Sequence, residues 1–193
     1  MAVKRAVGLA LLFIVTAAVL GATTARGADD TYQRTLVSYT VPDVVLVNQD
    51  GAKVRLGQIM NSGKPVVVDF IYGTCTTICP ILSASFSNLQ RKLGPDTRKI
   101  HLVSISIDPE HDTPKVMKEY LKRYGSKPGW DFFTGNRADI NKVMFALNAY
   151  IIDKMSHPPL MLIKPPGSSK WIRIYGLMGS AEFVAECQKA GIM

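Results

Sequence analysis

Apolar residues follow two different spacings along the chain, and together they predict alternating strands and helices. Two short runs, 43–47 and 52–56, flank the turn Asn48-Gln-Asp-Gly51 and predict a β-hairpin near the start of the folded part. The nearly continuous apolar run 65–71 is typical of a central strand buried on both faces. The run 101–107 predicts a second buried strand beside it.

Helical spacing appears between these strands and after them. Leu82, Phe86 and Leu89 predict a helix that stops at Gly94-Pro95, and Thr113-Pro114 is typical of a helix start. Further helices are predicted around 140–147 and 183–187, and further strands at 131–134, 160–163 and 171–175, the last two joined as a hairpin. This order predicts one α/β domain whose sheet is flanked by helices on both faces.

The first 25 residues have a different character. Lys4 and Arg5 precede an uncharged apolar run, 6–22, that ends in small residues, which is the layout of a secretory signal. The run is shorter than the roughly 20 apolar residues of a comfortable membrane span, so cleavage is favoured while an uncleaved N-terminal anchor stays open. We expect a signal peptide or anchor at 1–25, a linker at 26–33 and the folded domain at 34–193, outside the cytoplasm.

Composition and charge narrow the function classes. The 193 residues are 47% hydrophobic and 20% charged, which suits a globular protein with one core. The formal net charge of +8 includes cations in the leader, and what remains suits either docking to an acidic surface or an ordinary solvated face. Because no basic stripe interleaves with aromatic residues, we expect no nucleic-acid partner, and a membrane contact only through the N-terminal anchor.

The segment Gly73-Thr-Cys75-Thr-Thr-Ile-Cys79-Pro80 follows the central strand, where α/β sheets place their ligand sites. Pro80 suits a first helical turn, so Cys79 should lie at or near a helix start, whose dipole favours a thiolate. A thiolate is both a nucleophile and a metal ligand. Three intervening residues favour a metal site, since thiol–disulfide oxidoreductases usually have two, and an inert disulfide is the third interpretation.

Two cysteines need a third ligand, and the chain has three histidines, His101, His111 and His157. His101 opens a strand, and His111 lies in a turn that leads into a helix, so both are expected to be solvated. His157 stands before two prolines and a strand. In a thioredoxin-like arrangement the proline loop before that strand faces the cysteines, which selects His157.

Two thiolates and an imidazole suit copper, whose Cu(I) form accepts three ligands, whereas structural zinc usually takes a fourth protein ligand. Zinc stays open on ligand chemistry alone. Asp108 is expected to orient a ligand, to pair with a nearby cation, or to serve as a turn residue before proline. Cys187, on the inner face of the last helix, is expected to be a small buried apolar residue.

The segments 66–71, Cys75 to Pro80, 106–114, 133–135 and His157 before a strand together resemble the SCO/SenC family. The resemblance covers about residues 34–190. It implies a thioredoxin-like fold, copper held by Cys75, Cys79 and His157, and a metallochaperone that assembles copper centres, chiefly the dinuclear site of cytochrome c oxidase. The cysteine pattern looks like that of a bacterial subgroup, which implies a location in the periplasm or on the outer face of the inner membrane. In that subgroup the client could also be another copper enzyme, such as nitrous oxide reductase.

The resemblance also leaves a second function open. Some family members are proposed to be thiol–disulfide reductases for the cysteines of the client copper site, so the redox-active pair Cys75 and Cys79 is the alternative hypothesis. A peroxidase and a copper electron carrier are weaker hypotheses on the same residues. Two positions depart from the family, His111 where arginine is common and the double proline after His157, and neither removes a ligand.

Overall fold

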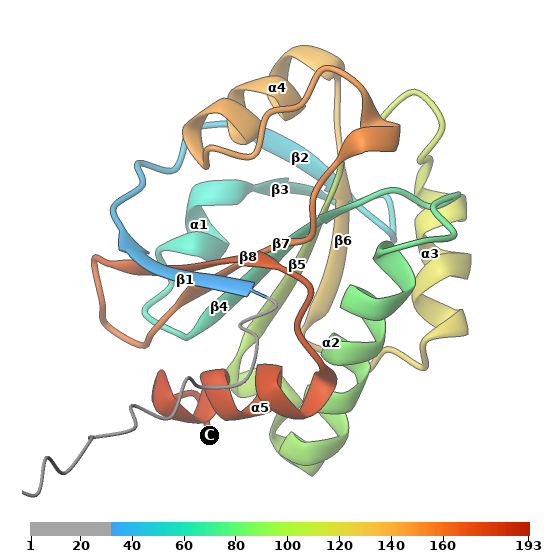
Figure 1. The fold of residues 1–193 in the computed structure, drawn as a ribbon. Coiled ribbons are helices and arrows are strands. Elements are labelled where there is room, and N and C mark those ends of the chain that lie inside the picture. Colours follow the sequence, from blue (N-terminus) through green and yellow to red (C-terminus); the bar gives the residue numbers. More distant parts are fainter. Residues whose placement is uncertain (1–31) are drawn as a thin grey trace, which may run out of the picture.

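The computed structural model describes residues 32–193, and one mixed sheet of eight strands runs through this part of the chain (Figure 1). The strand order is β1-β8-β7-β4-β5-β6-β2-β3. The strands β4, β5 and β6 are parallel, and the other pairings are antiparallel. Their bounds are β1 Tyr32–Val37, β2 Val45–Asn48, β3 Lys53–Arg55, β4 Val66–Ile71, β5 His101–Ser106, β6 Trp130–Thr134, β7 Leu160–Lys164 and β8 Trp171–Gly176.

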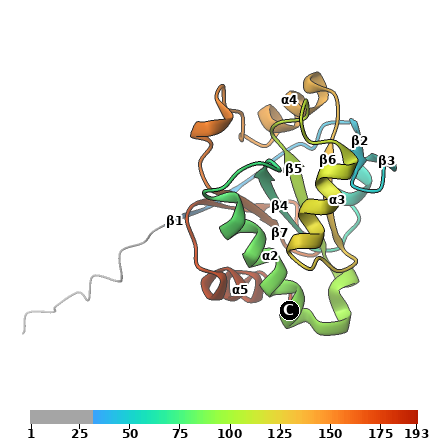
Figure 2. The same cartoon turned by 90° about the vertical axis from the view of Figure 1, so that its right-hand side faces the viewer.

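Helices cover both faces of this sheet, as the sequence predicts (Figures 1 and 2). The helices are α1 Leu56–Met60, α2 Cys79–Leu93, α3 Pro114–Arg123, α4 Arg137–Ala146 and α5 Ser180–Lys189, with 3-10 turns at Gly94–Lys99 and Lys154–Ser156. Thr113 caps α3 by accepting a hydrogen bond from the backbone N–H of Val116. The helices α2 and α5 pack against each other on one face of the sheet.

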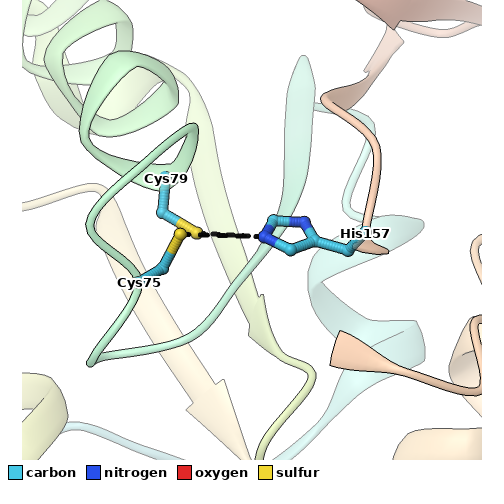
Figure 3. Close-up of side chains that lie close together, drawn as sticks. All are labelled: Cys75, Cys79 and His157. Carbon is cyan, nitrogen blue, oxygen red and sulfur yellow. Dashed lines mark hydrogen bonds between the residues drawn. The ribbon is translucent and has the colours of Figure 1, made fainter. Parts of the chain in front are cut away.

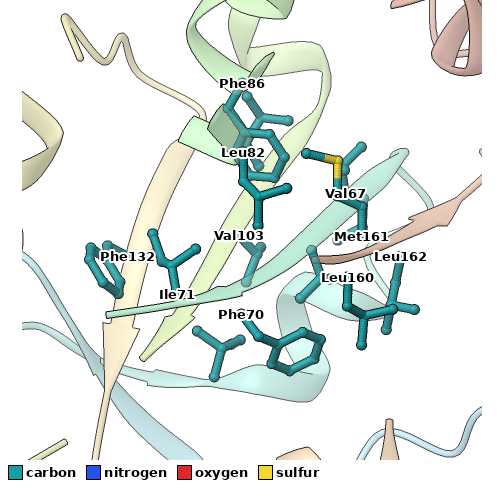
Figure 4. Close-up of a cluster of buried hydrophobic side chains, with 14 of the residues drawn as sticks. Val67, Phe70, Ile71, Leu82, Phe86, Val103, Phe132, Leu160, Met161 and Leu162 are labelled. Atoms are coloured by element: carbon teal, nitrogen blue, oxygen red, sulfur yellow. The ribbon is translucent and has the colours of Figure 1, made fainter. Parts of the chain in front are cut away.

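The core lies on both sides of β4. All six residues of this strand are buried, because the sheet continues on both of its edges and helices cover both of its faces. Figure 4 shows Leu82 and Phe86 of α2 on one side of the strand, and Phe70 and Leu162 on the other. The central position of the run 65–71 is therefore confirmed, and its end fixes the position of the cysteine segment that follows.

The N-terminal hairpin is confirmed, because β2 and β3 pair antiparallel. The strand β1 was not expected. It pairs with β8 and contains Tyr32 and Gln33, the last two residues of the predicted linker. As an edge strand it is mostly exposed, so it lacks the apolar pattern that reveals a buried strand. The predicted leader, 1–25, lies outside the described residues. Within residues 32–193, no helix is long and apolar enough to cross a membrane.

Candidate metal centre

The cysteine segment connects the carboxyl end of β4 to α2. Cys79 is the first residue of α2 and Pro80 the second, as expected from the tolerance of a first helical turn for proline. Cys75 lies in the preceding loop, where its backbone N–H donates to the carbonyl of Tyr72 over 3.2 Å. Both cysteines are buried free thiols. The two sulfurs thus lie on a short loop that β4 fixes at one end and α2 fixes at the other.

Gly73 anchors the start of this loop to the buried carboxylate of Asp112. The Gly73 N–H donates to Asp112 Oδ1 over 3.0 Å, and the Ser106 hydroxyl donates to the other oxygen over 2.5 Å. A Cβ atom on residue 73 would lie 2.7 Å from Asp112 Oδ1, so only glycine permits this approach. The loop is therefore tied to the segment after β5, which is the parallel neighbour of β4.

His157 reaches the sulfurs from the segment before β7. Its Nε2 lies 3.8 Å from Cys75 Sγ and 3.5 Å from Cys79 Sγ, and the three ligand atoms lie within 4.8 Å of one another (Figure 3). The ring packs edge-on against Tyr72, with 5.4 Å between the ring centres. Its Nδ1 is buried and has no hydrogen-bond partner in the described part of the chain. The three residues selected from the sequence are thus brought together.

The two thiols have different acidities. Burial raises the pKa of Cys75, but hydrogen bonds from Cys79, His157 and backbone N–H groups outweigh burial and lower the pKa to about 6. Burial and the neighbouring Cys75 both raise the pKa of Cys79. The thiolate favoured by the site is therefore that of Cys75. The helix start was expected to favour a thiolate at Cys79, whereas burial and the neighbouring Cys75 raise the pKa of that thiol.

Asp108 lies beside the cluster without belonging to it. Its carboxylate is buried and accepts hydrogen bonds from His111 Nδ1 over 2.9 Å and from Lys154 Nζ over 2.5 Å. Burial raises the pKa of Asp108, but these two partners outweigh it and keep the pKa below its usual value. Asp108 therefore joins the segment after β5 to the segment that carries His157.

The other candidate residues lie away from the cluster. His101 begins β5 at the opposite end of the sheet from the cysteines and is half-buried. His111 is exposed and faces Asp108. Cys187 is fully buried in α5, and burial raises its pKa to about 12, as befits an unreactive thiol in the core. These positions agree with the expectation that His111 is solvated and that Cys187 is a small buried residue of the core.

Sequence reasoning missed three polar residues around the centre. Tyr72 directly follows the central strand and contacts His157, and Lys154 binds Asp108. Asp69 is the one acidic residue inside the apolar run of β4, and this interruption was the available signal. Tyr72 and Lys154 gave no comparable signal, because aromatic and basic residues in loops are ordinary.

The geometry fits one metal ion. Three ligand atoms that surround an ion in a plane at about 2.2 Å lie roughly 3.8 Å apart, a separation close to the two sulfur–nitrogen distances here. Two sulfurs and one imidazole form a soft donor set. The same two thiols also lie close enough together for exchange with a disulfide, since each interacts with the other.

The chain is similar in sequence to proteins of one family. The SCO1/SenC family model matches residues 33–161. A SCO1 protein homologue of Bacillus subtilis is 36% identical over 116 residues, which are 59% of this chain and 58% of that protein. The first curated relatives are thus matched over only 43–58% of their own length.

Solved structures are matched more completely. BsSco, a member of the Sco family of cytochrome c oxidase assembly proteins in which a disulfide switch was identified, is 27% identical with a TM-score of 0.66 over 82% of this chain and 97% of its own. Bradyrhizobium japonicum ScoI, solved with copper bound, is 25% identical with a TM-score of 0.61 over 78% of this chain and 99% of its own. The expected thioredoxin-like fold is confirmed, and since the family model covers more than half of the sequence, the chain belongs to the SCO1/SenC family.

Proposed function

We propose that this protein is a copper metallochaperone that carries one copper ion on Cys75, Cys79 and His157 and supplies it to a respiratory copper enzyme. The observation that carries the proposal is the buried cluster of two Sγ atoms and one Nε2 within 4.8 Å of one another. The copper-bound structure of the related ScoI supports the choice of metal, and the family of BsSco supports cytochrome c oxidase as the client.

Copper suits this donor set better than zinc does. Cu(I) accepts three soft ligands, whereas a structural zinc site usually has four protein ligands. The residues His101, His111 and Cys187, which carry the remaining imidazoles and thiol among the described residues, lie outside the cluster, so no fourth imidazole or thiolate is in place. A three-ligand site also leaves one side of the ion open to a ligand from the receiving protein, which is what transfer requires.

Each residue has a separate task in this proposal. Cys75 supplies a thiolate readily, because its pKa is about 6, and Cys79 loses its proton when the ion binds. His157 presents the unprotonated Nε2 to the ion while the proton stays on Nδ1. The pair must be reduced to bind copper, so a disulfide between Cys75 and Cys79 would switch binding off.

Copper titration of the reduced, leader-free protein tests the proposal. Wild type should bind one Cu(I) per chain, and His157→Ala should weaken binding by at least tenfold, because one of three ligands is lost. His101→Ala is the matched control, since this histidine lies at the other end of the sheet, and it should bind as wild type does. Equal copper affinity of His157→Ala and wild type would refute the site.

A second function is favoured by the unequal acidities of the two thiols. In a thiol–disulfide oxidoreductase, the Cys75 thiolate would attack a client disulfide and form a mixed disulfide, releasing one client thiolate. Cys79 would then attack Cys75 Sγ, which releases the second client thiolate and leaves a Cys75–Cys79 disulfide. The client gains two electrons and the cysteine pair loses them. Rapid reduction of a copper-site disulfide by metal-free His157→Ala would favour this function over the chaperone.

We further propose that the folded domain works outside the cytoplasm, in a bacterial periplasm or on the outer face of the inner membrane. The basic, apolar and small-residue order of residues 1–25 supports export. Fractionation of cells that express the full chain would locate the protein. The expected partner is the client subunit that carries the copper site.

A further inference from the structure

His157 belongs to the segment between α4 and β7, whose part directly before His157, residues 152–156, is mostly exposed. The segment runs from the end of α4 to β7 and stands out from the sheet in Figure 2, where it is drawn in orange. Ile152 in this segment is 95% exposed and Met155 is 72% exposed. Ala149 and Ile151 pack on the core, so the contacts of residues 152–156 decide how the chain next to His157 is held.

One of these contacts is an ion pair with a buried partner. Lys154 Nζ lies 2.5 Å from Asp108 Oδ2, and the Asp108 side chain is only 5% exposed. The backbone N–H of Asp108 donates to the Ser106 hydroxyl over 3.0 Å, and that hydroxyl donates to buried Asp112. The carboxylate that receives Lys154 is thus fixed to the end of β5.

The Lys154 ammonium also contacts the ring on which His157 packs. It lies 5.4 Å from the centre of the Tyr72 ring, and Tyr72 packs edge-on against His157. The Tyr72 hydroxyl interacts with Met155 Sδ over 3.4 Å, which adds a second contact from the same segment. Lys154 therefore bridges the segment of His157, the segment of Asp108 and the aromatic ring between them.

We propose that Lys154 is a positioning residue, whose ion pair with Asp108 holds the His157 segment closed over Cys75 and Cys79 and so sets how long copper is retained. The inference deepens the proposed copper binding and rests on it. The contact is stronger than an exposed ion pair, because a charged hydrogen bond to a carboxylate with little access to water is costly to break. Its loss frees the segment without removing a ligand.

The first experiment measures copper dissociation. Reduced protein loaded with Cu(I) is mixed with an excess of a Cu(I) chelator, and wild type is compared with Lys154→Met, Lys154→Arg and Lys142→Met. We expect Lys154→Met to release copper about tenfold faster and Lys154→Arg, which keeps the cation, to stay within about twofold of wild type. Lys142→Met removes the exposed Lys142–Asp139 pair of α4 and should have no effect.

The second experiment uses the metal-free protein. Amide hydrogen exchange in residues 149–157 of reduced Lys154→Met should be at least fivefold faster than in wild type, while exchange in β4 and β5 stays unchanged. A wild type that fails to bind copper would refute the proposed function, yet this exchange measurement would still test the positioning. Lys154→Met that matches wild type in both copper release and segment exchange would overturn the inference.

Discussion

Asp69 is a carboxyl group buried in the centre of the sheet without the partner that such a group normally has. It is fully buried in β4, and neither carboxylate oxygen has a hydrogen-bond partner within residues 32–193. Burial raises its pKa to about 7, against a smaller opposing effect of the Ser104 side chain on β5. Near neutral pH, the folded protein therefore holds a proton that the unfolded chain has released.

This proton predicts a specific dependence of stability on pH. Since the folded pKa is above the unfolded value of 3.8, the contribution is complete below about pH 4 and is lost as pH rises through about 7. The loss amounts to at most about 4 kcal/mol, from roughly three pKa units at 1.36 kcal/mol each. Asp69→Asn should remove this pH-dependent contribution to stability. The unfolding free energy of wild type minus that of the variant should therefore shrink or reverse from pH 4.5 to 7.5.

Urea unfolding of both proteins at several pH values measures this difference. Other acidic groups contribute equally to wild type and to Asp69→Asn, so subtraction isolates Asp69. A difference that stays constant from pH 4.5 to 7.5 would mean that the carboxyl is ionised in the folded protein, and the pKa of about 7 would be wrong.

At the same scale, the sequence identified the three clustered residues proposed as ligands and missed the polar residues beside them. Cys75, Cys79 and His157 stood out because thiols and imidazoles are rare and chemically distinct. Lys154 and Tyr72 did not, because their role depends on which loops lie together in space, 46 residues apart for Lys154 and Asp108. The acidity of Cys75 relative to Cys79 also depends on burial, which the spacing of residues does not reveal.

The edge strand β1 and the helix α5 are joined by an ion pair with one buried member. Glu186 of α5 is 2% exposed and accepts from Arg34 Nε over 2.8 Å and from Lys189 Nζ over 2.7 Å. Burial raises the pKa of Glu186, but Lys189 and Arg34 outweigh burial and lower the pKa. The first strand of the described chain is thereby attached to its last helix.

Removal of Arg34 should weaken this attachment. Arg34→Met should lower the free energy of unfolding by about 1 kcal/mol at pH 7, since a charged hydrogen bond is lost while Lys189 still neutralises the carboxylate. Because the folded pKa of Glu186 is below its unfolded value of 4.5, the effect should be full above that value and fade as pH falls through the folded pKa. In Arg34→Met, the increase in amide exchange over wild type should be larger in β1 than in β4.

Arg55→Met is the matched control, because Arg55 pairs with an exposed carboxylate, Asp43, and should contribute little. Equal losses of stability in Arg34→Met and Arg55→Met would contradict the proposed role of the Arg34–Glu186 pair.

Among the elements, buried ones were predictable from their apolar pattern, and the exposed hairpin β2–β3 was predictable from its turn, whereas β1 has neither signal. The strands β4 and β5 are nearly continuous apolar runs because both of their faces are buried, and the helix α2 has apolar residues at helical spacing because one of its faces packs on the core. The strand β1 faces solvent over most of its length, and its place in the sheet follows from pairing with β8 rather than from its own residues. The short helix α1 begins at Leu56, which the sequence assigned to the second hairpin strand.

For the whole molecule, the proposed metal ligands come from two loops that only the completed sheet brings together. Cys75 and Cys79 follow β4, whereas His157 precedes β7, which pairs with β4. The ligand atoms of Cys79 and His157 are separated by 78 residues along the chain. An ion that needs all three ligands therefore binds the folded state and has no comparable site in the unfolded chain.

Copper should consequently raise the melting temperature of the reduced protein. With free Cu(I) held at about 100 times the dissociation constant, binding adds roughly 2.7 kcal/mol to the unfolding free energy. For a domain of this size that is a shift of about 5–10 °C. Calorimetry in a Cu(I)-buffered solution measures the shift, and protein oxidised to the Cys75–Cys79 disulfide is the control, because its sulfurs can no longer bind as thiolates. His157→Ala should show a smaller shift at the same free copper, whereas an equal shift in all three proteins would place the copper outside this centre.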